Sequence, residues 1–239
     1  MARDFYDDFA ADYHLAYGGR WDEAVERQGR ALAELLPDAR NVLDCSCGIG
    51  TQAVGLALRS YRVTGSDRST GAIERARREA ARLGADVRFD VADFRDLSTI
   101  AGEFDAVISC DNALPHLLAP ADVVTALEQM RSKLRAGGKL VVTMRDFDRA
   151  LEERPPVAHT VRVGDRVLVR LHEWEGDQYT VRYLVLDEAD GWRVTEHRTR
   201  YRAIPRAELE AAAREAGFAA STWLDHPVVG DQLTFVATA

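Results

Sequence analysis

The part of the sequence best suited to chemistry is a glycine loop that follows a short apolar run. It spells Asn41-Val42-Leu43-Asp44-Cys45-Ser46-Cys47-Gly48-Ile49-Gly50-Thr51, which predicts a buried strand, a loop and the start of a helix. Gly48 and Gly50 permit positive φ and let a ligand lie against the backbone without meeting a Cβ atom. No Gly-Lys-Ser/Thr follows, which excludes a P-loop, and the third glycine of a dinucleotide fingerprint is missing.

Acidic residues follow the next two predicted strands. Asp67 ends Val63-Thr64-Gly65-Ser66-Asp67, where a carboxylate can accept from both hydroxyls of a ribose bound over the glycine loop. Its alternative role is to cap the following helix, which Ser69 could also do. Asp93 could accept from an exocyclic adenine amine while Phe94 packs near the base. The loop and the two acids, in order at successive strand ends, indicate a nucleoside-binding site.

Strands and helices alternate from Asn41 to Thr143. The apolar runs predicted as strands are Asn41–Cys45, Arg62–Gly65, Val87–Phe89, Ala106–Cys110 and Leu140–Met144. The segments predicted as helices are Gln52–Arg59, Gly71–Leu83 and Val123–Leu134, the last of which stops at Gly137 and Gly138. Strands that alternate with helices form crossovers and a parallel sheet. The sequence therefore predicts an α/β fold with a Rossmann-like, doubly wound, mostly parallel sheet, and ligands beyond the carboxyl ends of its strands.

The flanking segments have other patterns. Two helices are predicted at the start of the chain, at Asp7–Ala16 and Asp22–Leu36. Four antiparallel strands are predicted later, at Thr160–Val163, Val167–Trp174, Tyr179–Leu186 and Trp192–Arg202. A last helix at Arg206–Ala216 precedes two strands, Ala220–Leu224 and Leu233–Val236. These two strands bring the main sheet to seven.

Composition limits the classes of partner. The chain has 239 residues and a formal charge of −8, from 31 Lys and Arg against 39 Asp and Glu, so its field repels polyanions and a nucleic-acid partner is not expected. No apolar run reaches the roughly 18 residues of a membrane span. The three cysteines are too few for a disulfide framework, and the spacing of Cys45 and Cys47 does not match a zinc knuckle. A soluble, cytoplasmic protein is the simplest expectation.

The order of these motifs resembles class I S-adenosylmethionine-dependent methyltransferases, over most of the chain. The resemblance implies S-adenosyl-L-methionine as cofactor, S-adenosyl-L-homocysteine as product, and no metal. Asp44 and the glycine loop would face the methionine part, Asp67 the ribose, and Asp93 with Phe94 the adenine. The residues that the resemblance assigns to cofactor binding are Tyr13, Trp21, Arg27, Asp44, Cys45, Gly48, Gly50, Asp67, Arg68, Asp93, Phe94 and Cys110.

Three features resemble the glycine and sarcosine N-methyltransferases within that class. Cys110-Asp111-Asn112-Ala113-Leu114-Pro115-His116-Leu117 is similar to their signature Gly-Asn-Ser-Phe-Ala-His-Leu, with Asn112 and His116 in matching places. Thr143-Met144-Arg145-Asp146-Phe147-Asp148 is similar to their Asp-His-Arg-Asn-Tyr-Asp, whose arginine pairs with the carboxylate of the acceptor. The antiparallel segment is similar to their substrate cap, in which Tyr201 would face the acceptor.

Each acceptor residue also has a purely structural alternative. Arg145 could pair with Asp146 or Asp148, Asn112 could serve as a turn residue before Pro115, and His116 is more often structural than a base. With Tyr17, these residues make up the predicted catalytic set: Asn112, Arg145, His116, Tyr17 and Tyr201.

The resemblance also predicts how the chain is organised. Residues 1–36 would form a helical lid over the cofactor, and residues 37–239 the methyltransferase domain, with the cap inserted at about 155–203. The lid carries Phe5, Tyr6, Tyr13, Tyr17 and Trp21, an aromatic face that suits a sulfonium cation or that packs the lid. Either Arg27 or Arg20 would take the carboxylate of the cofactor.

The activity expected from this pattern is methyl transfer from S-adenosylmethionine to the nitrogen of a small carboxylated amine, such as an amino acid. An O- or C-methyltransferase of a specialised metabolite, and a cofactor-binding module without turnover, remain open alternatives. The expected partner is a small-molecule acceptor, with no nucleic acid and no membrane, and the expected assembly is a monomer or a homodimer.

Overall fold

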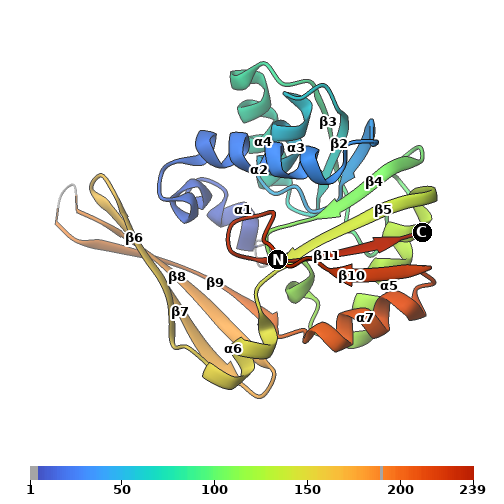
Figure 1. Ribbon diagram of the computed structural model, residues 1–239. Coiled ribbons are helices and arrows are strands. Elements are labelled where there is room, and N and C mark those ends of the chain that lie inside the picture. Colours follow the sequence, from blue (N-terminus) through green and yellow to red (C-terminus); the bar gives the residue numbers. More distant parts are fainter. Residues whose placement is uncertain (1–4, 189–190) are drawn as a thin grey trace.

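The computed structural model describes residues 5–188 and 191–239, so the first four residues of the expected lid lie outside the described part. Its strands form a seven-stranded sheet and a separate four-stranded sheet. In Figure 1 the four-stranded sheet stands away from the seven-stranded one, and the first helices of the chain lie near the space between them. Among the described residues, none of the helices combines the length and apolar character that crossing a membrane requires.

The seven-stranded sheet has the order β10-β11-β5-β4-β1-β2-β3. Its strands are β1 (Asn41–Asp44), β2 (Arg62–Asp67), β3 (Val87–Val91), β4 (Phe104–Ser109), β5 (Leu134–Met144), β10 (Ala220–Trp223) and β11 (Leu233–Thr238). The five strands from β3 to β5 pair in parallel, whereas β11 pairs antiparallel with both β5 and β10. The predicted doubly wound, mostly parallel sheet is confirmed.

Helices cover both faces of this sheet (Figure 1). One group is α2 (Trp21–Leu35), α3 (Thr51–Ala57) and α4 (Thr70–Leu83), and the other is α5 (Pro120–Ser132) and α7 (Arg206–Glu215). α2 and α3 touch through their backbones, since a Cβ built on Gly29 would lie 2.5 Å from the carbonyl carbon of Gly55. Beside this contact, the buried Gln52 donates to Gln28 at 2.8 Å. The glycines therefore set how closely the helix before the glycine loop packs on the helix after it.

The four-stranded sheet, here called the cap, is antiparallel with the order β6-β7-β8-β9. Its strands are β6 (Val157–Val163), β7 (Arg166–Glu175), β8 (Gln178–Asp187) and β9 (Arg193–Arg202), and α6 (Phe147–Glu153) links it to β5. Alternate residues of β8, among them Tyr179 and Tyr183, are buried. Because side chains alternate along a strand, the cap buries one face and exposes the other.

The prediction of one continuous helix at Asp7–Ala16 is wrong. The chain forms α1 (Phe5–Phe9) and a separate 3-10 helix, η1 (Tyr13–Tyr17). Asp12 lies between them, and its carboxylate pairs with Arg166 of the cap at 2.6 Å and lies 3.5 Å from His197. This contact with a distant part of the chain breaks the helix that local spacing favoured.

The predicted end of the third helix is also wrong. α5 ends at Ser132, and Gly137 and Gly138 lie inside β5. The register between β4 and β5 jumps from Phe104↔Leu134 to Ala106↔Lys139. The glycines thus belong to an irregularity in the strand, where Gly137 takes a positive φ of 72°.

The contact of α2 with α3 can be tested by Gly29→Ala. A Gly-to-Ala change within a helix ordinarily stabilises it by about 0.5–1 kcal/mol. Here the added methyl meets backbone atoms that cannot turn away, so we expect the free energy of unfolding to fall by about 1–3 kcal/mol. Urea denaturation measures the change. A variant as stable as the wild type, or more stable, would contradict the close packing of the two helices.

Candidate active site

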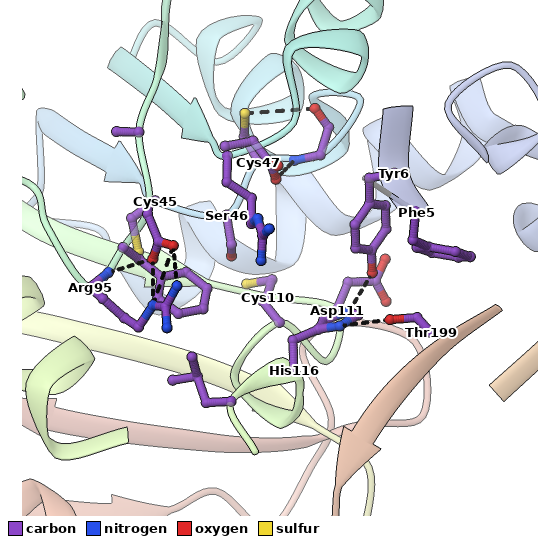
Figure 2. A pocket seen from close by; sticks show the side chains of 18 of the residues that line it. Phe5, Tyr6, Cys45, Ser46, Cys47, Arg95, Cys110, Asp111, His116 and Thr199 are labelled. Atoms are coloured by element: carbon purple, nitrogen blue, oxygen red, sulfur yellow. Dashed lines mark hydrogen bonds and ion pairs between the residues drawn. The ribbon is translucent and has the colours of Figure 1, made fainter. Parts of the chain in front are cut away.

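A cavity of about 560 Å³ lies beyond the carboxyl ends of β1, β2, β3 and β4, in the size range of small-ligand sites. The residues that line it include Phe5, Tyr6, Tyr13, Tyr17, Cys45, Ser46, Cys47, Gly48, Thr51, Asp67, Arg68, Asp93, Phe94, Arg95, Cys110, Asp111, His116 and Thr199. Figure 2 shows several of these side chains around the cavity, from the glycine loop across to Thr199 of the cap. Strand ends and the N-terminal helices therefore enclose one space.

The two glycines of the loop have different roles. Gly48 takes a φ of 52°, and a Cβ built on it would meet nothing within 4 Å, so the loop leaves open space against its backbone. Gly50 has a φ of 91° at the start of α3, where a Cβ would lie 3.3 Å from Ala76. Gly48 is thus the residue that faces the cavity, whereas Gly50 is required by packing and by the turn.

Asp67 fastens the end of β2 to the glycine loop. Its carboxylate accepts from the backbone N–H of Gly48 at 2.9 Å and from that of Ser69 at 2.9 Å. Ser69 is the residue that caps α4, with its hydroxyl accepting from Ala72 N–H at 3.0 Å. The capping role that the sequence left open for Asp67 therefore belongs to Ser69.

Asp93 lines the cavity together with Phe94 and is held by Arg95, whose guanidinium donates to it at 2.7 Å. Burial would raise the pKa of this carboxyl, but the hydrogen bonds from Arg95 outweigh it and lower the pKa. Arg95 also donates to Asp122, at 3.3 Å. The third strand end thus presents an ionised carboxylate in a fixed position.

Aromatic residues of α1 and η1 cover the opposite side of the cavity. Tyr6 packs edge-on against Tyr13 with ring centroids 6.0 Å apart, and Tyr13 against Tyr17 at 5.9 Å. The Tyr6 hydroxyl lies 2.7 Å from His116 Nε2, and the Thr199 hydroxyl lies 3.3 Å from His116 Nδ1 (Figure 2). Burial lowers the pKa of His116 to about 3, so the imidazole is neutral and its two nitrogens are already engaged.

The comparisons with known proteins agree on one class. A family model described as a methyltransferase domain matches residues 42–138. A glycine/sarcosine N-methyltransferase from Parasynechococcus marenigrum is 34% identical over 155 residues, covering 61% of this chain and 55% of that protein. The solved structure of an amino pentose methyltransferase from Micromonospora echinaspora, with S-adenosylmethionine bound, is 28% identical with a TM-score of 0.71, covering 95% of each chain.

The chain contains a methyltransferase domain at residues 42–138, and its relatives and structural neighbours support a class I S-adenosylmethionine-dependent methyltransferase. The resemblance expected from the sequence is confirmed, and S-adenosylmethionine is the cofactor of this family. A structure from Clostridium acetobutylicum, an S-adenosylmethionine-dependent methyltransferase, shares the fold with a TM-score of 0.79 at 14% identity and covers 98% of this chain and 99% of that one. The chain spans little more than half the length of its Parasynechococcus relative.

Three features of this methyltransferase fit the cofactor of its family, two on the cavity wall and one buried at the end of β1. Space lies open against Gly48, the Asp67 carboxylate stands at the neighbouring strand end, and the buried Asp44 has one oxygen, Oδ2, with no hydrogen-bond partner among the described residues. Burial raises the pKa of Asp44 to about 8, so this carboxyl is protonated at neutral pH in the absence of a positive partner.

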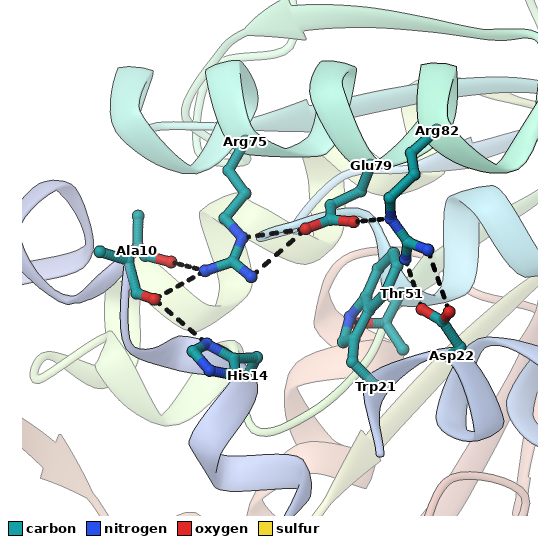
Figure 3. Close-up of polar contacts among 9 residues, drawn as sticks. Ala10, His14, Trp21, Asp22, Thr51, Arg75, Glu79 and Arg82 are labelled. Carbon is teal, nitrogen blue, oxygen red and sulfur yellow. Dashed lines mark hydrogen bonds and ion pairs between the residues drawn. The ribbon is translucent and has the colours of Figure 1, made fainter. Parts of the chain in front are cut away.

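Four of the predicted cofactor residues do not line the cavity: Asp44 and Gly50 are buried beside the glycine loop, and Trp21 and Arg27 lie on α2. Trp21 is buried at the start of α2, where its indole donates to Thr51 at 2.8 Å and Arg82 lies over its ring. Figure 3 shows Arg82 in a polar cluster with Glu79 and Asp22. Arg27 is exposed on α2 and does not line the cavity. Trp21 therefore reaches the site only through Thr51, which lines the cavity.

The predicted acceptor residues Asn112, Arg145 and Tyr201 lie behind the cavity rather than on its wall. Asn112 Oδ1 accepts from the backbone N–H of Arg145 at 2.7 Å. The ion pairs considered for Arg145 do not form, because Asp146 caps α6 and Asp148 bonds Arg206. Tyr201 packs on His116 with ring centroids 4.3 Å apart.

Several residues of this region were not anticipated from the sequence. They are Thr51, Arg95, Asp111, Arg170, His172 and Gln232. Asp111 sits inside the recognised string Cys110–Leu117, and its charge beside Asn112 was an available signal. Arg170, His172 and Gln232 come from the cap and the last loop, and only the folded chain brings them near β5.

The open space at Gly48 can be tested by comparing an alanine substitution there with the same substitution at a similar glycine outside the cavity. Gly48→Ala adds a methyl that projects into the cavity, and we expect the dissociation constant for S-adenosylhomocysteine to rise at least tenfold in calorimetry. Gly84→Ala is the control, since Gly84 also has a positive φ, 70°, and open space around it, but it is exposed at the end of α4. Both variants lose about 1 kcal/mol of stability from backbone strain. Equal affinities in the two variants would place the ligand elsewhere.

The buried carboxyl of Asp44 predicts a pH-dependent stability. Its pKa in the folded protein, about 8, lies above the ordinary 3.8, so folding takes up a proton between these values. The wild type should therefore lose stability relative to Asp44→Asn as the pH rises from about 4 to 8, by roughly 2–5 kcal/mol, and no further above that. Urea denaturation of both proteins across this range measures the difference. A difference that stays constant with pH would show that Asp44 is ionised when buried.

Proposed function

We propose that this protein transfers a methyl group from S-adenosylmethionine to the nitrogen of a small carboxylated amine, such as an amino acid. The observation that carries the proposal is the convergence of the glycine loop, Asp67 and Asp93, from three neighbouring strand ends, on one cavity closed by tyrosines. The similarity to a glycine/sarcosine N-methyltransferase supports nitrogen as the acceptor atom.

The cofactor would be held by groups at the strand ends. Asp67 would accept from its ribose, Asp93 from its adenine amine beside Phe94, and the amino-acid part would lie over Gly48 and near Asp44. When bound, the cofactor supplies a methyl group on a positively charged sulfur, which an electron-rich nitrogen can attack. The Tyr13 and Tyr17 rings give this end of the cavity an aromatic surface, which is favourable for a cation.

The contribution of the protein to such a reaction is chiefly positioning and exclusion of water. Both can supply much of a rate enhancement without a strong base. The helices α1 and η1 cover the cavity, and Arg75 of α4 holds them there by donating to the carbonyls of Ala10 and Ala11 at 2.7 and 2.8 Å (Figure 3). The N-terminal segment thus closes the site over whatever it contains.

Two arginines favour an acceptor with an anionic group. Arg145 follows β5, and its Nη1 lies 3.5 Å and 3.4 Å from the two ring nitrogens of His172. Arg170 lies two residues before His172 on the same face of the cap, opposite Tyr183. In the described part of the chain, neither arginine forms an ion pair with a carboxylate. Two half-buried guanidiniums without a counter-ion are stabilised by an anion, and a carboxylate matches their fork geometry.

Ring contacts connect these arginines with the cavity. His116 on the cavity wall packs on Tyr201, Tyr201 lies 5.5 Å from Tyr179, and Tyr179 lies 4.9 Å from His172. Burial, with the charges of Arg145 and Arg170, lowers the pKa of His172 to about 3, so this histidine adds no positive charge. The acceptor would lie with its nitrogen toward the cavity and its carboxylate toward the cap.

An amino sugar is the second candidate acceptor. The amino pentose methyltransferase structure covers 95% of this chain, whereas the glycine/sarcosine relative covers 61% of it. The two candidates share the methylated atom, nitrogen, and differ in the group that the cap would bind. O- or C-methylation, or cofactor binding without turnover, would leave the two arginines without a corresponding role.

A screen of acceptors separates these possibilities. Amino acids, N-methyl amino acids, amino sugars, simple amines and alcohols are incubated with S-adenosylmethionine, and the S-adenosylhomocysteine formed is measured. The proposal expects turnover with carboxylated amines. Turnover with amino sugars alone would favour the second candidate, and cofactor binding in calorimetry without product would favour a non-catalytic module.

The role of Arg145 is tested with Arg145→Gln. Loss of a charged hydrogen bond to the acceptor costs about 1.5–3 kcal/mol, so we expect KM for a carboxylated amine to rise about 10- to 100-fold, with little change in KM for the corresponding amine without a carboxylate. Arg182→Gln is the control, since Arg182 is exposed on the outer face of the cap with Glu173 and Glu196. An unchanged KM for every carboxylated acceptor would remove Arg145 from the acceptor site.

A further inference from the structure

We propose that Asp111 is the residue that binds the amino group of the acceptor and receives the proton that this group loses before methyl transfer. This inference rests on the proposed function and deepens it, because it names the group that recognises nitrogen. Asp111 lines the cavity directly after β4, at the edge of the sheet where Gly48 and Asp67 also lie. Figure 2 shows it between Cys110 and His116, on the side of the cavity that faces the cap.

Neutral donors hold the Asp111 carboxylate in place. Tyr17 donates its hydroxyl to Oδ2 at 2.6 Å, and Gln232 donates its amide to Oδ1 at 2.8 Å. In the described part of the chain Asp111 has no ion pair with a basic residue, unlike Asp93, which pairs with Arg95. A carboxylate oxygen can accept more than one hydrogen bond, so both oxygens retain capacity for a further donor.

Two series of hydrogen bonds end at this carboxylate. On one side Trp21 donates to Thr51, Thr51 donates to Tyr17, and Tyr17 donates to Asp111. On the other side Asp111 N–H donates to the Thr143 hydroxyl, which donates to Gln232 Oε1 and so turns the amide N–H₂ of Gln232 toward Asp111. Both series end at the Asp111 carboxylate, whose two oxygens act as acceptors in them.

The backbone is strained to present this side chain. Asp111 and Asn112 take positive φ of 65° and 66°, a region that costs most residues with a Cβ about 1–2 kcal/mol and costs Asp and Asn less. The Asn112 side chain holds the turn by accepting from Arg145 N–H at 2.7 Å. Strain of this kind persists where the surrounding structure enforces it, and it is concentrated at functional sites. The turn also joins the proposed amine-binding residue directly to the arginine proposed for the carboxylate.

These features fit an amine better than an alcohol. An ammonium or amine N–H can donate to Asp111, and the negative carboxylate attracts a charged ammonium into the cavity. An acceptor that enters as an ammonium first gives one proton to Asp111, which frees the nitrogen lone pair. The lone pair then forms the new N–CH₃ bond while the S–CH₃ electron pair returns to sulfur, the product leaves as the methylated ammonium, and Asp111 releases its proton to water. An alcohol would need a stronger base for its less acidic proton, and the adjacent His116 has a pKa of about 3.

The test uses Asp111→Asn, which keeps the shape of the side chain and a residue type that tolerates positive φ. With an amine acceptor identified by the screen, kcat/KM should fall at least 100-fold, while the dissociation constant for S-adenosylhomocysteine stays within threefold of the wild type. Gln232→Leu removes one donor but leaves the carboxylate, and it should lower kcat/KM much less. Asp38→Asn, at an exposed position far along the sequence, is the control for a lost charge.

The outcomes separate this inference from the proposed function. If the wild type methylates amines and Asp111→Asn does so equally well, the role of Asp111 is wrong and the proposed function stands. If Asp111→Asn loses affinity for S-adenosylhomocysteine as much as it loses activity, Asp111 serves the cofactor and the inference is also wrong. If the wild type acts only on alcohols or carbon acceptors, both proposals fail.

Discussion

The parallel pairing of β1 with β2 and β4 is the constraint on which the rest of this structure depends. Parallel strands end at the same edge of a sheet, so residues that are far apart in the sequence and follow β1, β2, β3 and β4 must meet there. The hydrogen bond from Gly48 to Asp67 fixes the first two ends relative to each other. The strands of the cap are antiparallel, so their carboxyl ends do not meet at one edge of that sheet. The cap borders the cavity through Thr199.

The sequence was most informative where local pattern and tertiary position coincide. Gly48, Asp67, Asp93 and Phe94 were predicted to share one site because each stands at or shortly after the end of a predicted strand, and all four line the cavity. Asp44 and Gly50 were predicted as well, but both are buried and neither lines the cavity. The motifs of this region lie within a few residues of the strand ends that position them.

The sequence was least informative where two distant segments meet. Arg27 was predicted because it is a cation in the N-terminal segment. Which way a helix residue faces depends on what the helix packs against, and Arg27 is exposed to solvent. Arg170 and His172 alternate with apolar residues like any strand of a sheet, so nothing in β7 alone distinguishes them. The break between α1 and η1 likewise depends on Arg166, more than 150 positions away along the chain.

The pair formed by Asp12 and Arg166 has a mechanical consequence. It fastens the N-terminal segment to the cap, while Arg75 fastens the same segment to α4. The two covers of the cavity are therefore tied to each other and not only to the central sheet. Any opening wide enough to exchange a bound nucleoside must stretch or release this tie, so the N-terminal segment and the cap should respond to the arrival of a ligand as a single moving part.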